Sequence, residues 1–281
     1  MTNDMNTKFL ARAVIVLLAL TVVILVAASF YAEEIVSAVF PGAVVDIPLG
    51  APPPPPTILA PRGALPAGPG GLKEWTRYGN GDYGLAGSGF LLRLYDGRII
   101  GVTTAHSVEA LGQPGSQLNH IAFSRPDQPR PFVVECDTLY GQPGVARRGD
   151  DLTVDYVLLH VNGPLDTSLA LAPDPRGAPQ PGERVTLFGG VGDLNGGRRL
   201  FSGVVVVSDD KGAWAQMDED FEPAMLSGSP FVSEHTGLVV GMTLSFTRRE
   251  GRLFIGLHPI GHLVEMAEAA REFPKIGEYQ R

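Results

Sequence analysis

The 281-residue chain is poor in cysteine and in basic side chains. Its single cysteine, Cys136, excludes an intramolecular disulfide, and we expect it to be a small buried residue of a strand. Lysine and arginine total 22 against 30 acidic residues, so the net charge is −8, and the basic residues form no stripe along the sequence. This balance argues against nucleic-acid binding.

Long helical patterns are also scarce, whereas glycine (35 residues) and proline (24 residues) are plentiful. Short apolar runs separated by turn residues predict an all-β fold. The dipeptides Asp96-Gly97 and Asn195-Gly196 predict hairpins. Only residues 261–273 have helical spacing, which predicts a short C-terminal helix. Strands are expected at 89–95, 98–104, 131–136, 155–161, 184–188, 200–207, 213–217, 230–232, 237–246 and 253–257.

One long hydrophobic run lies near the N-terminus. Residues 13–31 carry no charge, which predicts a transmembrane signal-anchor helix. Basic residues precede this run, so residues 1–12 are expected in the cytoplasm and the rest of the chain on the periplasmic or extracellular side. The alternative is a signal peptide cleaved near Val26–Ala28, which would give a secreted protein; the run is longer than the usual ~7–15 residues of such a peptide.

The next segment, residues 32–74, is a Pro/Gly-rich linker that contains five consecutive prolines at 52–56. Such a run adopts extended polyproline II and predicts a semi-rigid spacer. Residues 75–281 are expected to form the globular domain.

Three residues of that domain together predict a catalytic site with a serine nucleophile. His106 ends Thr103-Thr104-Ala105-His106, Asp155 opens the apolar run that continues to Leu159, and Ser227 begins Ser227-Gly228-Ser229-Pro230. A serine hydroxyl is a weak nucleophile until a base takes its proton, and an imidazole base needs a carboxylate to orient it. Asp150 and Asp151 are rival candidates for the carboxylate, but Asp155 adjoins the apolar run directly.

Together with Gly87-Ser88-Gly89-Phe90, these segments resemble the trypsin/chymotrypsin-like serine proteases, in particular the bacterial, disulfide-poor members. The resemblance implies two six-stranded antiparallel β-barrels, a protein or peptide substrate and no cofactor. It further implies that His106 is the general base, that Asp155 orients it and that Ser227 attacks the scissile carbonyl. The backbone N–H groups of Met225 and Ser227 would form the oxyanion hole.

The chain departs from the pattern of this family at two positions before the serine. Met225 stands where the family usually has glycine, and a Cβ there opposes the tight turn. Leu226 replaces the usual aspartate, so activation through a newly freed α-amino group is not expected. By resemblance, the substrate pocket would be lined by Phe221, Ser245, Phe246 and Thr247.

Two functions therefore follow from the sequence. The first is a membrane-tethered extracytoplasmic serine endopeptidase, and the alternative is a catalytically impaired fold that serves as a binding or sensing module. No metal site is expected, because Pro259 and Gly261 interrupt the helix that would pair His258 with His262.

Overall fold

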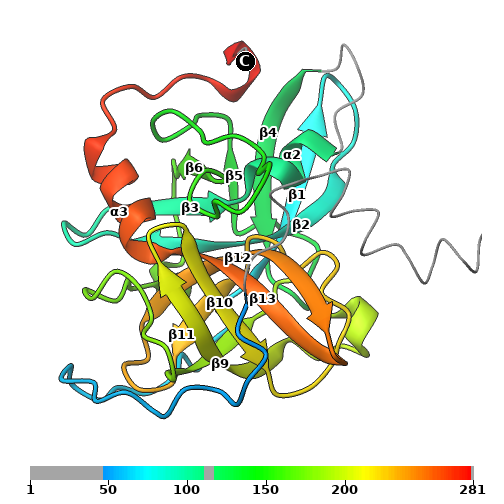
Figure 1. The fold of residues 1–281 in the computed structure, drawn as a ribbon. Coiled ribbons are helices and arrows are strands. Elements are labelled where there is room, and N and C mark those ends of the chain that lie inside the picture. Colours follow the sequence, from blue (N-terminus) through cyan, green and yellow to red (C-terminus); the bar gives the residue numbers. More distant parts are fainter. Residues whose placement is uncertain (1–46, 111–116, 280–281) are drawn as a thin grey trace, which may run out of the picture. The chain divides into compact units, whose positions relative to one another are not determined.

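β-Strands form most of the regular structure in the computed structural model, which describes residues 47–110 and 117–279 (Figure 1). Residues Ile47–Arg147 and those from Asp151 onward form one compact unit, and Arg148–Asp150 belong to another. The helix predicted at 13–31 lies outside the described residues. Among the described helices, none is long and apolar enough to cross a membrane.

The first barrel is a sheet in the order β5-β4-β1-β2-β3-β6, with β7 paired in parallel to β2. An antiparallel bridge between Leu139 and Leu159 brings the two ends of this sheet together, so the barrel is nearly closed. Its strands are β1 (Leu72–Tyr78), β2 (Gly84–Arg93), β3 (Ile99–Thr103), β4 (Leu118–Ser124), β5 (Val134–Cys136), β6 (Val157–His160) and β7 (Ala170–Leu171).

Phe123 fills the centre of this barrel. Its ring lies where Gly89 and Gly101 leave room, since a Cβ on either glycine would come within 2.8 Å of the ring. The predicted Asp96-Gly97 hairpin joins β2 to β3, and Gly97 adopts a φ of 88° there. Cys136 is buried and free, as expected.

The second barrel closes in the order β10-β13-β12-β11-β8-β9. Its interior is apolar and includes Phe201, Phe231 and Ile255. Helix α3 (Ile260–Ala269) follows the last strand. The strands of this barrel are β8 (Arg184–Phe188), β9 (Leu200–Asp209), β10 (Gly212–Met217), β11 (Pro230–Ser233), β12 (Val239–Arg249) and β13 (Arg252–Pro259).

The predicted all-β fold with two barrels and a short helix near the C-terminal end is confirmed. The predicted strands recur, that at 184–188 with the same bounds and the others with shifted ends, whereas β1, β4 and β7 were not anticipated. The Asn195-Gly196 hairpin also pairs β8 with β9, but through a longer connection that contains a 3₁₀ turn at Asp193–Asn195. Helix α3 begins at Ile260, so Pro259 stands just before its first turn, a position that proline tolerates.

Residues 47–71 contain no helix or strand and form a strap along the second barrel. The Gly63 N–H donates to the carbonyl of His235 at 2.9 Å, and the His235 ring is 2.9 Å from the carbonyl of Ala60. The Arg252 guanidinium donates to the carbonyls of Leu49 and Gly50. Figure 1 shows the first part of the strap in blue beside the second barrel. The described part of the expected spacer is therefore docked.

A prediction tests this docking. A Cβ on Gly63 would lie 2.1 Å from the carbonyl oxygen of Thr236, so Gly63→Ala forces the strap off the barrel. We expect a loss of about 1–3 kcal/mol in the free energy of unfolding, measured by urea denaturation, and faster proteolysis within 47–71. Gly68→Ala is the control, because a Cβ there meets nothing within 4 Å. Equal stability of the two variants would contradict the docking.

Candidate active site

His106 and Asp155 meet at one end of the first barrel. His106 lies in the first turn of α2 (Ala105–Ala110), and Asp155 stands two residues before β6. The His106 Nδ1 is 2.8 Å from the Asp155 Oδ2. The Asp155 Oδ1 accepts from the backbone N–H groups of Ala105 (2.7 Å) and His106 (3.1 Å). One carboxylate thus holds both the ring and the backbone of His106.

Burial and hydrogen bonding oppose each other at Asp155, which is 1% exposed. Burial by itself raises the pKa, but the bonds from the His106 ring and from the backbone N–H groups of Arg147 and His106 outweigh it, so the pKa lies below its ordinary value. Of the rival carboxylates, Asp151 accepts from the N–H and the hydroxyl of Thr153.

Ser227 lies in the tight turn that leads into β11. Met225 in this turn has a φ of 68°, in the left-handed region that side chains rarely adopt. Leu226 is fully buried in the core of the second barrel, which agrees with its apolar character. Gly228 has a φ of 88° and donates its N–H to the carbonyl of Thr243 at 2.8 Å. The turn is therefore formed with methionine where glycine was expected.

Ser88 on β2 joins the first barrel to this turn. Its N–H donates to the carbonyl of Ser227 at 3.0 Å, and its hydroxyl donates to the carbonyl of Met225 at 2.8 Å. A Cβ on the neighbouring Gly87 would lie 3.5 Å from the Ser227 carbonyl oxygen and 3.6 Å from Cβ of Ser107. The segment that carries His106 and the turn that carries Ser227 therefore meet around Gly87.

Two backbone donors of the turn have no partner within the described residues. The hydrogen bonds there engage the carbonyls of Met225 and Ser227, but not their N–H groups. Unpaired backbone N–H groups beside a nucleophile are the donors that an oxyanion requires. Both residues are partly exposed.

The four expected pocket residues do not share one environment. Phe221 is buried in the second barrel, where its ring stacks on Phe201 with the centroids 3.9 Å apart. Phe246 is exposed, Thr247 is partly buried, and the Ser245 hydroxyl accepts from the Arg147 guanidinium at 2.8 Å. Arg248, which follows Thr247, donates from its guanidinium to the Phe221 carbonyl (2.7 Å) and to Asp220 (2.9 Å), and so connects the segments that carry Phe221 and Thr247.

A histidine pair lies beside Asp155. His258 Nε2 is 2.9 Å from His262 Nδ1, and the Tyr156 ring meets both rings edge to face. Burial, followed by the neighbouring His262, lowers the pKa of His258 to about 3, so His258 is neutral. Within the described residues no group of three His, Cys, Asp or Glu side chains could hold a metal ion.

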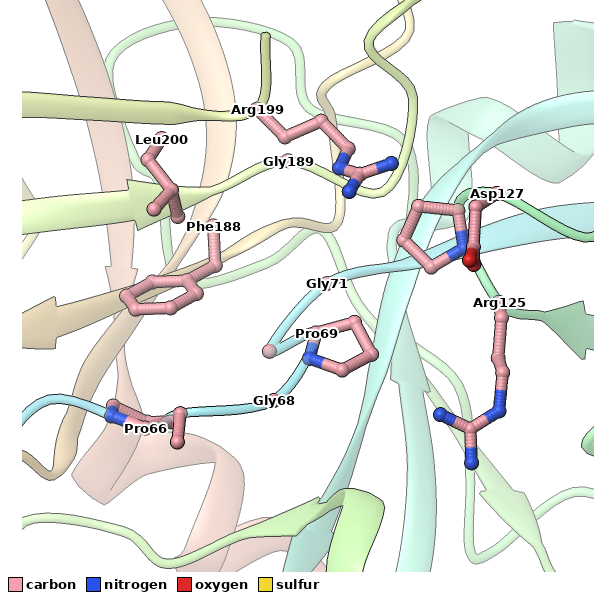
Figure 2. A pocket seen from close by; sticks show the side chains of 13 residues that line it. Pro66, Gly68, Pro69, Gly71, Arg125, Asp127, Phe188, Gly189, Arg199 and Leu200 are labelled. Atoms are coloured by element: carbon pink, nitrogen blue, oxygen red, sulfur yellow. The ribbon is translucent and has the colours of Figure 1, made fainter. Parts of the chain in front are cut away.

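A groove of about 350 Å³ lies where the end of the strap passes between the barrels. Figure 2 shows Pro69 between Phe188 of the second barrel and Arg125 and Asp127, which follow β4 of the first. Gly189 lines the groove, and a Cβ on it would touch Leu226 at 2.9 Å.

Comparison with known proteins gives similarity in structure only. No protein-family model and no curated protein sequence matches the chain. A serine endoprotease from Yersinia pestis is similar over 73% of this chain and 65% of its own length, which is less than two thirds, at 18% identity and a TM-score of 0.46.

Two further solved structures are similar to this chain. A thermostable serine protease from an extremophilic microorganism is 16% identical (TM-score 0.49; 72% of this chain, 97% of that one). Kallikrein-related peptidase 10 is 14% identical (TM-score 0.44; 72% of this chain, 95% of that one).

Sequence reasoning did not identify Ser88 as a contact of the Ser227 turn, nor Glu74, whose Oε2 accepts from the hydroxyl of Ser107 beside His106. Ser88 was noted only within the Gly87–Phe90 motif, and Glu74 is a single acid in a strand that was not anticipated. A buried position for Glu74 could have been inferred only from the alternation of Leu72, Glu74 and Thr76 along one face of β1.

The ionised state of Asp155 gives a testable prediction for stability. Its lowered pKa means that the carboxylate stabilises the fold above about pH 4, the ordinary value, and that this contribution is lost as the pH falls through the lowered value. We expect Asp155→Asn to lose about 2–3 kcal/mol of unfolding free energy at pH 7, measured by urea denaturation, and less below pH 4. Asp151→Asn is the matched control, and an equal loss in both variants would contradict a special role for Asp155.

Proposed function

We propose that the protein is a serine endopeptidase that hydrolyses peptide bonds through His106, Asp155 and Ser227. The observation that supports this proposal best is that Asp155 contacts both the ring and the backbone N–H of His106. The chain segment that carries His106 also meets the Ser227 turn, which is hydrogen-bonded to β2. These residues supply the three groups that acyl transfer needs: a base, a carboxylate that orients the base, and a hydroxyl group.

In the proposed reaction, Asp155 engages Nδ1 of His106, which leaves Nε2 free to take the proton from the Ser227 hydroxyl. The Ser227 oxygen then bonds to the scissile carbonyl carbon, and the N–H groups of Met225 and Ser227 donate to the oxygen that becomes negative. His106 returns the proton to the leaving amine as the C–N bond breaks. Water, activated by His106, then releases the acyl group from Ser227.

The sequence adds a location to this proposal. The uncharged run at 13–31, with basic residues before it, supports a single-pass anchor in the cytoplasmic membrane and a peptidase domain outside the cytoplasm. Cleavage near Val26–Ala28 would instead release the protein, and mass spectrometry of its N-terminus separates the two cases.

A second candidate is a catalytically impaired fold that binds or senses a polypeptide. One observation favours it. The Met225 backbone lies in a left-handed conformation that costs a residue with a Cβ about 1–2 kcal/mol, so the oxyanion turn is held against a local preference. Measured turnover that depends on His106 would eliminate this candidate.

Replacement of the nucleophile tests the proposed enzyme. We expect the wild-type protein to be labelled by a fluorophosphonate probe and to hydrolyse an unstructured protein substrate, and Ser227→Ala to lose both activities by at least about a thousandfold. Ser229→Ala is the matched control from the same turn, because its hydroxyl is buried and has no hydrogen-bond partner among the described residues. Labelling that survives in Ser227→Ala, or is absent from a folded wild-type protein, would refute the peptidase.

The Met225 turn gives a prediction that separates the two candidates. If the turn is already formed, Met225→Gly should change the labelling rate by less than about threefold, because glycine adopts the same φ freely. Met225→Val should reduce that rate by at least about tenfold, since a β-branched residue opposes a positive φ. A large gain in Met225→Gly would instead indicate that methionine impairs the site.

A further inference from the structure

A second carboxylate lies buried behind the candidate active site. Glu74 points inward from β1 and is 0% exposed. It faces Gly87 across the strand pair, and a Cβ on Gly87 would lie 3.4 Å from the Glu74 Oε2. The Glu74 carboxylate thus packs beside Gly87, at a distance that a Cβ there would reduce to ordinary van der Waals contact.

The contacts of Glu74 lie on both sides of His106 along the chain. Its Oε2 accepts from the hydroxyl of Thr103 at 2.8 Å and from the hydroxyl of Ser107 at 2.9 Å. Its Oε1 is buried and has no hydrogen-bond partner among the described residues. A fully buried carboxylate with one unpaired oxygen is costly for folding, so its presence here needs an explanation.

Both hydroxyl groups have a second acceptor, so the network has two arrangements. The Thr103 hydroxyl is also 3.0 Å from the carbonyl of Ser88, and the Ser107 hydroxyl is 3.0 Å from the carbonyl of Thr104. Each hydroxyl has a single proton to donate. An ionised Glu74 attracts both protons, whereas a neutral Glu74 releases them to the backbone carbonyls. Ser88, whose carbonyl is one of these acceptors, also bonds to the Ser227 turn. A change between the two arrangements is therefore transmitted to that turn.

The charged and titratable groups that face Glu74 are few within the described residues. His106 on α2 interacts with its charge, and Tyr78 on the same strand does so as well. Burial, and then Glu74, raises the pKa of Tyr78 to about 12, so Tyr78 is neutral. The other contacts, from β2, β3 and β4, are made by Gly87, Thr103 and Phe123, which carry no charge.

We propose that Glu74 is a positioning residue for His106: the ionised carboxylate fixes the Thr103 and Ser107 hydroxyls on either side of it and stabilises the imidazolium formed when His106 takes the proton of Ser227. This role rests on the proposed peptidase function. In this role Glu74 is a second carboxylate beside Asp155, which touches the imidazole. Glu74 acts through the backbone of β3 and α2 and through its charge.

The physical environment makes this contribution dependent on pH. Burial raises the pKa of Glu74 to about 7, against the smaller opposing effects of its two hydroxyl partners and of His106. Glu74 is therefore neutral in mildly acidic solution and ionised in mildly basic solution. If the Glu74 side chain had a purely structural role, the labelling rate would not change as the carboxyl group ionises.

The test is the pH dependence of fluorophosphonate labelling in the full-length protein, compared between wild type and Glu74→Gln from pH 5.5 to 9. We expect wild type to react roughly tenfold faster than the variant at pH 8.5 and at nearly the same rate at pH 5.5. Glutamine resembles the neutral acid, so the ratio of the two rates should rise around pH 7. Glu135→Gln, a change of an exposed acid on β5, is the control and should give a ratio near one at every pH.

Several outcomes would overturn the proposal. A ratio that is constant with pH, at one or above it, would leave Glu74 a structural residue only. If Glu74→Gln fails to fold, Ser107→Ala removes one donor to the carboxylate and so raises the pKa of Glu74 further; its labelling should fall behind wild type more at pH 7 than at pH 9. A deficit independent of pH would overturn the role equally. Absence of Ser227-dependent labelling in the wild-type protein would remove the peptidase function, and this role with it, a result distinct from a flat ratio.

Discussion

The attachment of Ser88 to the Ser227 turn is the contact on which the candidate site depends. Ser88 of β2 donates hydrogen bonds to the carbonyls of both Met225 and Ser227. These two bonds fix the position of the first barrel against the turn of the second. Glycines permit the approach, because a Cβ on Gly228 would lie 1.9 Å from the carbonyl oxygen of Ser88. His106 and Asp155 lie beside strands of the first barrel and Ser227 precedes β11 of the second, so this contact is where the two barrels that carry the candidate residues meet.

The same contact explains how methionine occupies a position that favours glycine. The Met225 carbonyl is held by the Ser88 hydroxyl, and the following Leu226 is anchored in the core of the second barrel. A residue fixed on both sides can be kept in a left-handed conformation that it would not choose alone. Tertiary packing therefore decides the turn, and the local preference of the sequence does not.

The sequence predicted the hairpin at Asp96-Gly97 and all six strands of the second barrel, whereas the triad of His106, Asp155 and Ser227 stays a prediction. These features have local signals: turn dipeptides, apolar runs and short motifs beside strands. It did not predict β1, whose inward face carries Glu74 and Thr76 and therefore lacks the apolar alternation of a core strand. Nor did it predict that the strap would be docked, because His235 and Arg252, which contact Ala60 and Leu49, are distant from them in the sequence.

The strap also has a consequence for the order of events during synthesis. Leu49 leaves the ribosome early, whereas its partner Arg252 is made 203 residues later. At ordinary elongation rates this interval lasts roughly ten to forty seconds. During that time the strap has no completed second barrel on which to dock. The strap therefore docks late, only after the second barrel has formed.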